Sequence, residues 1–294
     1  MKNSSKSIKP NTKTSLITYI ILIVAFVVVQ IMLATGSMSY MMQDLLVPLC
    51  VYAILAVSLN LTVGILGELS LGQAGFMCIG AYSGALFSNL METAIPEAIV
   101  RFPIALLLGG VCAAIFGILI GIPVLRLRGD YLAIVTLAFG EIIKNICASI
   151  YLGKDANGFQ TSLKSVSDMN MANDGEMLIN GALGINGTPH DSNFVIAFII
   201  LFVTVIISYN FVNSRTGRAV MSIRDNKIAA ESIGINITKY KLITFALTAF
   251  LAGVAGVIYS HNFSTLQASK FDYNTSILVL VFVVLGGIGS IRGS

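Results

Sequence analysis

Charged side chains are scarce in this sequence. Asp, Glu, Lys and Arg account for 11% of its 294 residues, whereas apolar residue types account for 56%. A typical soluble domain carries about 25% charged residues, so this chain has too few to cover a water-facing surface. The scarcity excludes an ordinary soluble domain and indicates that lipid is the solvent for most of the surface. The net charge is only +4, and the basic residues form no stripe of the kind that binds nucleic acid.

Several other features are missing. Trp is absent, so an aromatic belt at the membrane surface must consist of Tyr and Phe. The four cysteines lie far apart within apolar runs, with no CxxC pair and no nearby His. They indicate small buried residues rather than a disulfide framework or a metal site. No G-x-x-x-x-G-K-S/T loop occurs, so the chain is expected to bind no cofactor, and any ATP must be bound by another chain. No cluster of His, Asp and Glu indicates a catalytic site.

Long apolar runs are what the sequence does contain. A helix that crosses about 30 Å of hydrocarbon needs about 20 residues, and unpaired backbone groups are too costly in lipid for other spanning structures except barrels. The runs lack the alternation of a β-barrel. We therefore predict an all-α fold, a polytopic transmembrane helix bundle of about eight spans that forms a single domain over residues 1–294. The predicted spans are Leu16–Ala34, Leu45–Leu66, Ala74–Leu90, Phe102–Ile122, Tyr131–Leu152, Phe194–Val212, Leu242–Ser260 and Thr275–Ser290.

The basic residues predict which side of the membrane each loop faces, because Lys and Arg are enriched in cytoplasmic loops. Four lysines precede the first span, which places the N-terminus and the tail 1–15 in the cytoplasm. Alternation along eight spans then places 13 basic residues inside and four outside, with Lys144 within a span. The loop 213–241, which holds six of them, is predicted to be cytoplasmic, and 153–193 is the large external loop. We expect a multi-pass protein of the cell membrane.

The start of the chain leaves one alternative open. A basic start, an apolar run and the small residues at 34–37 also resemble a cleavable signal peptide, although the run is longer than the usual signal core. The topology of the remaining spans is the same in either case.

The external loop 153–193 is rich in Asn, Gly and Ser, and we expect it to be solvated and partly flexible. A docking surface for an external partner is the functional alternative. The stretch Gly184–Gly187 predicts a tight turn within it. His190 and His261 are both predicted to be external and are far apart in the sequence, so structural or incidental roles are expected for them.

A first polar cluster lies between the second and third spans, where residues 64–75 combine four glycines with three polar side chains. One interpretation is a tight cytoplasmic turn followed by close helix packing. The other is a broken helix, whose free N–H and C=O groups must face protein or water and suit a zwitterion such as an amino acid. In the second interpretation this cluster and residues of neighbouring spans line a substrate pathway. The candidate pathway residues are Asn60, Gly64, Ser70, Gly72, Gln73, Gly75, Thr136 and Glu141.

Glu141 is the ionisable residue best placed near the middle of the membrane, where a charge is costly and usually faces protein or water. Lys144 follows three residues later, so the two side chains can pair on one helical face. A structural ion pair and a pathway-lining carboxylate are both compatible with this spacing. A catalytic carboxylate dyad is not indicated, because no second intramembrane acid is evident.

The cytoplasmic loop 213–241 contains an amphipathic pattern. Apolar residues at 219, 223, 230 and 233 recur at roughly helical spacing, with charged residues between them. The pattern predicts one short helix over 218–233 at the membrane surface, ended by Gly234. A soluble partner protein could grip such a helix, and binding to anionic lipid is the alternative.

Four segments together resemble the permease subunits of branched-chain amino acid ABC importers, and more closely the LivM type of the two paired permeases. The resemblance covers nearly all of residues 45–294 in the same order. The segments are NLTVGILGELSLGQAGFMCIGAY at 60–82, LRLRGDYLAIVTLAFGEIIK at 125–144, SRTGRAVMSIRDNKIAAESIGIN at 214–236 and VVLGGIGSIRG at 283–293.

The resemblance implies one permease half of an ATP-driven importer of Leu, Ile or Val. It also implies three kinds of partner: a second, homologous permease of the LivH type, two cytoplasmic ATPases that hydrolyse the ATP, and an external substrate-binding protein. This chain would itself be no enzyme. Its segment 224–234 resembles the coupling helix that meets the ATPase. The implied coupling residues are Arg224, Asp225, Ala229, Ala230, Glu231 and Gly234.

The chain departs from the family pattern in two places. ABC import permeases often carry E-A-A-x-x-x-G in the coupling helix; here Ala229, Ala230 and Gly234 match, but Ile228 takes the place of the glutamate. Similar permeases usually continue through another apolar span after the GGxGSxxG stretch, whereas this chain stops at Ser294, so a truncated C-terminus is expected.

Two other functions are compatible with parts of the sequence. Permeases for urea or short amides look similar, although LRGDYLAIVTLAFGEI favours the amino acid type. An ion-coupled secondary transporter that works alone would need several intramembrane acids, and only Glu141 is well placed.

Overall fold

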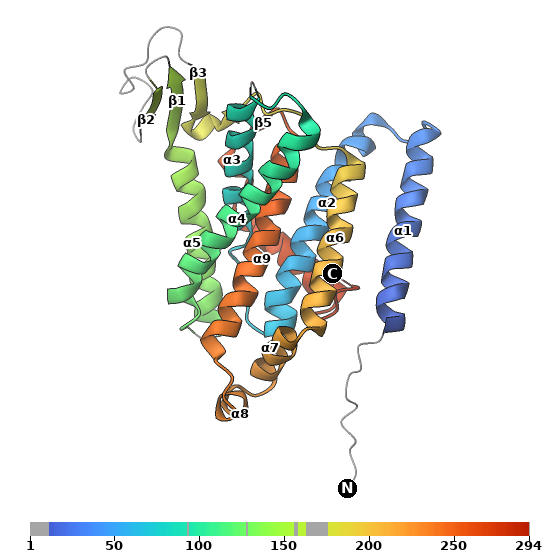
Figure 1. The fold of residues 1–294 in the computed structure, drawn as a ribbon, viewed down its shortest axis with the longest axis vertical. Coiled ribbons are helices and arrows are strands. Elements are labelled where there is room, and N and C mark those ends of the chain that lie inside the picture. Colours follow the sequence, from blue (N-terminus) through green and yellow to red (C-terminus); the bar gives the residue numbers. More distant parts are fainter. Residues whose placement is uncertain (1–11, 93, 128, 156–157, 163–175, 294) are drawn as a thin grey trace.

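The computed structural model describes residues 12–92, 94–127, 129–155, 158–162 and 176–293. These residues form a bundle of long helices with short strands at one end (Figure 1). We call the end with the strands the sheet end, and the opposite end, which carries α7 and α8, the α8 end. The helices are α1 Thr12–Ala34, α2 Tyr40–Asn60, the π-helix η1 Leu61–Leu66, α3 Gln73–Met91, α4 Ala98–Val124, α5 Asp130–Ser149, α6 Phe194–Asn213, α7 Arg215–Asp225, α8 Lys227–Ser232, α9 Ile237–Ser260 and α10 Tyr273–Gly286.

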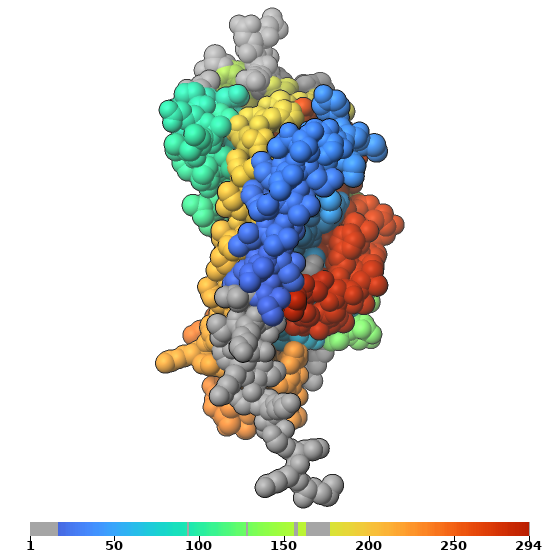
Figure 2. All heavy atoms as spheres, turned by 90° about the vertical axis from the view of Figure 1, so that its right-hand side faces the viewer, coloured from blue at the N-terminus to red at the C-terminus, as the bar shows by residue number. Residues whose placement is uncertain are grey.

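The predicted all-α transmembrane bundle is confirmed. Within the described residues, eight helices are long and apolar enough to cross a membrane, and they coincide with the eight predicted runs. The first of them, α1, lies on the outside of the bundle (Figure 2). It meets α6 through Tyr19, which packs against Phe202 and Tyr209. Residues 1–11 of the predicted tail lie outside the described residues.

Several predicted span boundaries are wrong. The second, fourth and seventh spans begin earlier than predicted, at Tyr40, Ala98 and Ile237. The fifth span was predicted to reach Leu152, but α5 ends at Ser149, and Ile150 is already extended. The last span was predicted to reach Ser290, but α10 ends at Gly286 because Gly287 has a φ of 101°. In both cases the apolar pattern continues past the helix, and hydropathy alone does not report the change of backbone conformation.

The external loop was predicted to be solvated and partly flexible, and its described part contains short β-strands with both exposed and buried residues. Three strands pair antiparallel in the order β2-β1-β3, and β4 pairs with β5, which follows α9. Apolar side chains of β3 and β4 are buried against the bundle, which the composition of the loop did not indicate. Residues 163–175 lie outside the described part. The strands are β1 Tyr151–Asp155, β2 Gly158–Ser162, β3 Glu176–Asn180, β4 Ile185–Asn186 and β5 Thr265–Leu266.

The centre of the bundle is the contact between α3, α4 and α9, which approach closely because small residues line their interface. A Cβ atom on Gly80 of α3 would lie 2.2 Å from the carbonyl oxygen of Gly253 on α9. One on Gly109 of α4 would lie 2.9 Å from the carbonyl oxygen of Gly80. The three helices therefore meet backbone to backbone. The sequence signal for this contact is the Gly80-x-x-x-Gly84 spacing in α3, because two glycines four residues apart are typical of closely packed membrane helices.

Gly80→Ala is expected to destabilise the folded chain, because the added methyl group would overlap backbone atoms of α9 that no side-chain rotation can move. Overpacking of this kind costs roughly 1–3 kcal/mol. Gly140→Ala on α5 is the matched control, since a Cβ there meets nothing closer than 3.7 Å. Thermal unfolding in detergent should show a lower midpoint for Gly80→Ala and an unchanged or higher one for Gly140→Ala. Equal midpoints for both variants would contradict the close contact.

Candidate functional site

The polar stretch 64–75 is a broken helix that turns back into the bundle. α2 continues without interruption into the π-helix η1, and Gly67, with a φ of 78°, ends that helix. The chain is then non-helical until α3 begins at Gln73. Gly67 and Leu69 are exposed, whereas Ser70 and Gln73 are only 2% and 1% exposed, so the segment enters the protein in its second half. The cluster thus combines an exposed turn at Gly67 with a buried non-helical stretch that leads into α3.

Side chains from three helices hold the start of α3. The N–H of Leu71 donates to Thr136 Oγ1 of α5 at 2.9 Å, and Gln73 Nε2 donates to Ser58 Oγ of α2 at 2.5 Å. The N–H of Ala74 donates to the hydroxyl of a serine on α10, Ser276, at 3.0 Å. Backbone groups that a broken helix leaves free are thereby satisfied inside the bundle.

The predicted pathway glycines pack against neighbouring backbone. A Cβ on Gly64 would lie 2.3 Å from the backbone nitrogen of Gly289, and one on Gly75 would lie 2.7 Å from the Cα of Gly140. Asn60 Oδ1 accepts a hydrogen bond from the Gly289 N–H at 2.8 Å. The structure therefore brings Asn60 and Gly64 together with the C-terminal segment and Gly75 together with α5, and their side of the cluster is packed and not open.

Glu141 holds the start of α10. Its Oε1 accepts the N–H of Tyr273, the first residue of α10, at 2.8 Å, and its other oxygen is paired with Lys144. Asp272 caps the same helix by accepting the N–H of Thr275 at 3.0 Å. Negative groups at a helix N-terminus are stabilised by the helix dipole. The predicted ion pair is present, and the carboxylate has in addition a structural role that the sequence did not indicate.

The broken ends of α3 and α10 meet beside α5. Ser276 of α10 binds the N-terminus of α3, and Glu141 of α5 binds the N-terminus of α10. The gap between the three helices, lined by Leu71, Glu141, Tyr273 and Ser276 among others, is too narrow to hold a water molecule. The side chains of Glu141 and Lys144 are 25% and 19% exposed. This junction can present polar side chains and helix N-termini in the middle of an apolar bundle.

Sequence reasoning missed Ser276 and Asp272. The signal for the second was present, since an Asp three residues before a Thr at the start of an apolar run is typical of a helix cap. No local signal could have found Ser276, because its partner, Ala74, lies 202 residues away.

The loop 213–241 holds two helices, where one helix over 218–233 was predicted. Asn226 is extended, with φ −155° and ψ 103°, and separates α7 from α8. Its Oδ1 accepts the N–H of Ala229, so the same residue ends one helix and caps the next. The predicted stop at Gly234 is confirmed. Its φ is 85°, its N–H donates to the Glu231 carbonyl, and the next N–H donates to the Ala230 carbonyl.

The six residues of the predicted coupling segment face different ways. Ala230 is buried, and Arg224, whose side chain is 38% exposed, lies against the bundle, where its Nη1 donates to the Gly64 carbonyl at 3.0 Å. The remaining four residues are exposed: Asp225, Ala229, Glu231 and Gly234. Two apolar residues of the same end, Ile228 and Ile233, are 81% and 74% exposed. The exposed surface of α8 is thus partly apolar.

A buried ion pair that sequence reasoning missed fastens the broken helix to α9. Lys241 Nζ bonds to Glu68 Oε1, with side chains 6% and 18% exposed. Lys241 was counted only as a basic loop residue, whereas it lies in the first turns of α9 and points into the protein. Thr62 of η1 and Thr248 of α9 share a second hydrogen bond of 2.8 Å.

A further polar cluster lies at the sheet end. Arg101 and Asp191 form an ion pair of 2.8 Å that joins α4 to the loop before α6. His261 is fully buried; its Nδ1 lies 2.9 Å from the Val257 carbonyl, which can only accept, and its Nε2 lies 2.7 Å from Ser88 Oγ. The neutral ring therefore accepts from Ser88. The predicted structural role of this histidine agrees with its position.

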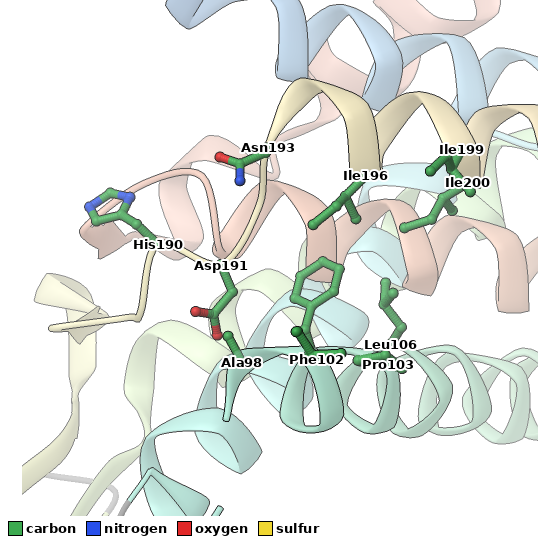
Figure 3. Close-up of a pocket in the computed structure, with 11 residues that line it drawn as sticks. Ala98, Phe102, Pro103, Leu106, His190, Asp191, Asn193, Ile196, Ile199 and Ile200 are labelled. Atoms are coloured by element: carbon green, nitrogen blue, oxygen red, sulfur yellow. The ribbon is translucent and has the colours of Figure 1, made fainter. Parts of the chain in front are cut away.

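Burial lowers the pKa of His261 below its ordinary value, and the charge of Arg101 acts in the same direction. The hydrogen bond to Val257 and the carboxylate of Asp191 oppose that shift. Beside this cluster a groove of about 490 Å³ runs between α4 and α6 (Figure 3). In that view Phe102 projects from α4 toward Ile196 of α6, and the ring of His190 turns away from the groove.

Comparison with known proteins matches residues 41–294 to the family described as "Branched-chain amino acid transport system / permease component". The chain is 33% identical over 249 residues to the high-affinity branched-chain amino acid transport system permease protein LivM of Salmonella typhimurium, and equally to that of Escherichia coli. Each alignment covers 82% of this chain and 57% of the relative, so the chain spans little more than half the length of these proteins. It is also 24% identical over 253 residues to the fructose import permease protein FruG of Bifidobacterium longum, with 82% and 67% covered. No solved structure matches the chain.

Breaking the Lys241–Glu68 pair from either side is expected to destabilise the chain more than removing both charges. A single partner left behind is an uncompensated charge in a dry environment, which costs about 3 kcal/mol, whereas a double replacement by uncharged side chains is often close to neutral. The variants are Glu68→Gln, Lys241→Met and the double variant, compared by unfolding in detergent. Additive effects of the two single substitutions would contradict a direct pair.

His261 is expected to make the folded chain less stable in mild acid. Because its pKa is lower in the folded state than in the unfolded state, the unfolded chain binds the proton more tightly, and stability falls as the pH drops below about 6.5. The measurement is the unfolding midpoint between about pH 7.5 and about pH 5.5, where histidines titrate. His261→Gln should flatten this pH dependence, and His190→Gln, at an exposed histidine, should not. A steep profile that persists in His261→Gln would rule out this assignment.

Proposed function

The chain belongs to the family of permease components of branched-chain amino acid transport systems, and we propose that it is one half of the membrane pathway of an ATP-driven importer of Leu, Ile or Val. It is an ABC-type permease and a multi-pass membrane protein. The relatives that are 33% identical carry branched-chain amino acid transport in their names, which supports this substrate over the sugar of the more distant relative.

The junction of α3, α10 and α5 carries the proposal. A substrate with both a carboxylate and an ammonium group needs charged partners inside the membrane, and the partly exposed Glu141–Lys144 pair supplies one of each sign. Glu141 and Lys144 are partly exposed on the twelfth and fifteenth of the twenty residues of α5. Direct contact of such charges with lipid is costly. We therefore place the substrate path and the second, homologous permease at this face of α5 and α10.

The two ends of the bundle suit different partners. We propose that the α8 end faces the cytoplasm, as the six basic residues of 213–241 favour, and that the two ATPases bind there. Ile228 replaces the glutamate common in coupling helices, and its side chain is 81% exposed. The contact with the ATPase would then rest on apolar burial at Ile228 and Ile233, with Glu231 beside them. The sheet end would face outward and receive the substrate-binding protein.

Reconstitution in liposomes tests this function. The chain is combined with its candidate partner permease, ATPases and binding protein, and uptake of labelled leucine is measured with and without ATP. Uptake should require ATP and every partner, and unlabelled isoleucine or valine should compete with the label. Uptake by the chain alone, driven by an ion gradient, would contradict an ABC importer. ATP-driven uptake of labelled fructose or urea in place of leucine would contradict the substrate.

Glu141→Gln refines the test. The amide oxygen can still accept the Tyr273 N–H, so the junction should remain folded while the charge is removed. Leucine uptake should fall by about tenfold or more, the effect of losing one charge-assisted hydrogen bond. Asp44→Asn, at an exposed carboxylate of α2, is the matched control and should transport normally. Normal uptake by Glu141→Gln would remove this carboxylate from the pathway.

A further inference from the structure

α7 packs against the π-helix η1 and against α6 and α9 at the α8 end. Besides the main core, the described residues contain a second, smaller cluster of buried apolar side chains. Leu61, Ile65 and Leu66 of η1 form most of it, and Val220 of α7 and Leu251 of α9 complete it. Val220 is fully buried there. Apolar burial thus holds α7 against η1, and we call this contact the Val220 joint.

Arg224 adds a polar bond to this joint. Its Nη1 donates to the Gly64 carbonyl at 3.0 Å, and its Nε and Nη2 donate to Asp225 Oδ1 at 3.1 and 3.0 Å. The stem of the side chain lies flat against Gly67, where a Cβ would come within 2.6 Å of its Cγ. Asp225 therefore orients the guanidinium, and Gly67 leaves room for it to reach the backbone of η1.

The Gly64 carbonyl needs this donor because the helix ends just beyond it. The N–H groups of Gly67 and Glu68 both donate to the Thr62 carbonyl. The chain then leaves the helix before a later N–H can reach Gly64, and a buried carbonyl without a donor is unfavourable. A π-helical turn holds one residue more than an α-helical turn, and such turns are often found at functional sites. A shift of the hydrogen-bond register of η1 by one residue would change the length of the helix. It would also place a different carbonyl opposite the guanidinium of Arg224.

η1 leads directly to the polar junction. Four residues after Gly67 the chain reaches Leu71, whose N–H is bound by Thr136, and two residues later it enters α3. On the other side, Asn60 binds the Gly289 N–H next to Gly64. A displacement of α7 that pulled on the Gly64 carbonyl would therefore act on the start of α3 through a short stretch of backbone.

We propose that Arg224 is a positioning residue that couples α7 to the substrate pathway by holding the Gly64 carbonyl of η1. This rests on the proposed function, in which ATPases move the α8 end. α7 and η1 move as one body through the Val220 joint, and the guanidinium transmits the movement to the backbone that positions α3. The coupling is reciprocal, so the state of the pathway also biases the position of α7.

The test compares Arg224→Gln and Arg224→Lys with Arg218→Gln, a substitution at an exposed arginine of the same helix. In the reconstituted importer, Arg224→Gln should keep ATPase co-purification and ATP hydrolysis. Leucine taken up per ATP hydrolysed should fall about tenfold, as for the loss of a hydrogen bond from a charged donor. Arg224→Lys, which retains a single donor, should recover part of the ratio, and Arg218→Gln should match the wild type. An unchanged ratio in Arg224→Gln, or loss of ATPase binding in proportion to uptake, would overturn the proposal.

A second measurement stands apart from transport. Hydrogen–deuterium exchange on the full chain in nanodiscs, without partners, reports the link itself. Arg224→Gln should speed exchange of amides in 64–75, and Arg218→Gln should leave them unchanged. Unchanged exchange in Arg224→Gln would overturn the link. Faster exchange together with a wild-type complex that takes up no leucine with ATP would contradict the proposed function and leave the link standing.

Discussion

The whole arrangement depends on one constraint, which is that lipid offers no hydrogen bonds to a free backbone N–H or C=O group. Eight long helices satisfy this constraint by themselves. The two interruptions, between η1 and α3 and between α9 and α10, satisfy it partly through side chains. Thr136 and Ser276 bind the start of α3, and Glu141 binds the start of α10. Each break is therefore a place where the fold and the proposed pathway use the same groups.

Ion pairs mark three levels of the bundle. Lys241 and Glu68 pair near the α8 end, Glu141 and Lys144 pair at the junction, and Arg101 and Asp191 pair at the sheet end. Two of these pairs join segments far apart in the sequence and are largely buried, where a lone charge would be strongly unfavourable. The pair at the junction is the most exposed of the three. This difference in burial, rather than the presence of charge, separates the groups that hold the fold from those we assign to transport.

Much of the fold could be predicted because long apolar runs leave a helix bundle as the main solution. The stop at Gly234 could be predicted too, since a glycine after a helical pattern is typical of a left-handed cap. The break at Asn226 was missed, because Asn is tolerated within short helices and its capping role depends on an extended backbone. The strands in the external loop were missed, since β3 and β4 contain few residues and gain their stability from burial against the bundle. Among the site residues, Glu141 and Thr136 could be singled out as polar groups in apolar spans.

The sequence by itself determined the membrane class, the number of spans and the family, because these follow from local composition and from motifs that are contiguous in the chain. Only the tertiary structure decided which groups each break uses. Arg224 looked like a surface charge for a partner, yet it binds the Gly64 carbonyl, 160 residues away. Lys241 looked like a loop residue, yet it pairs with Glu68 inside the protein. The physical reason is that the partners of a buried polar group are set by packing between distant segments, and local sequence carries no record of that packing.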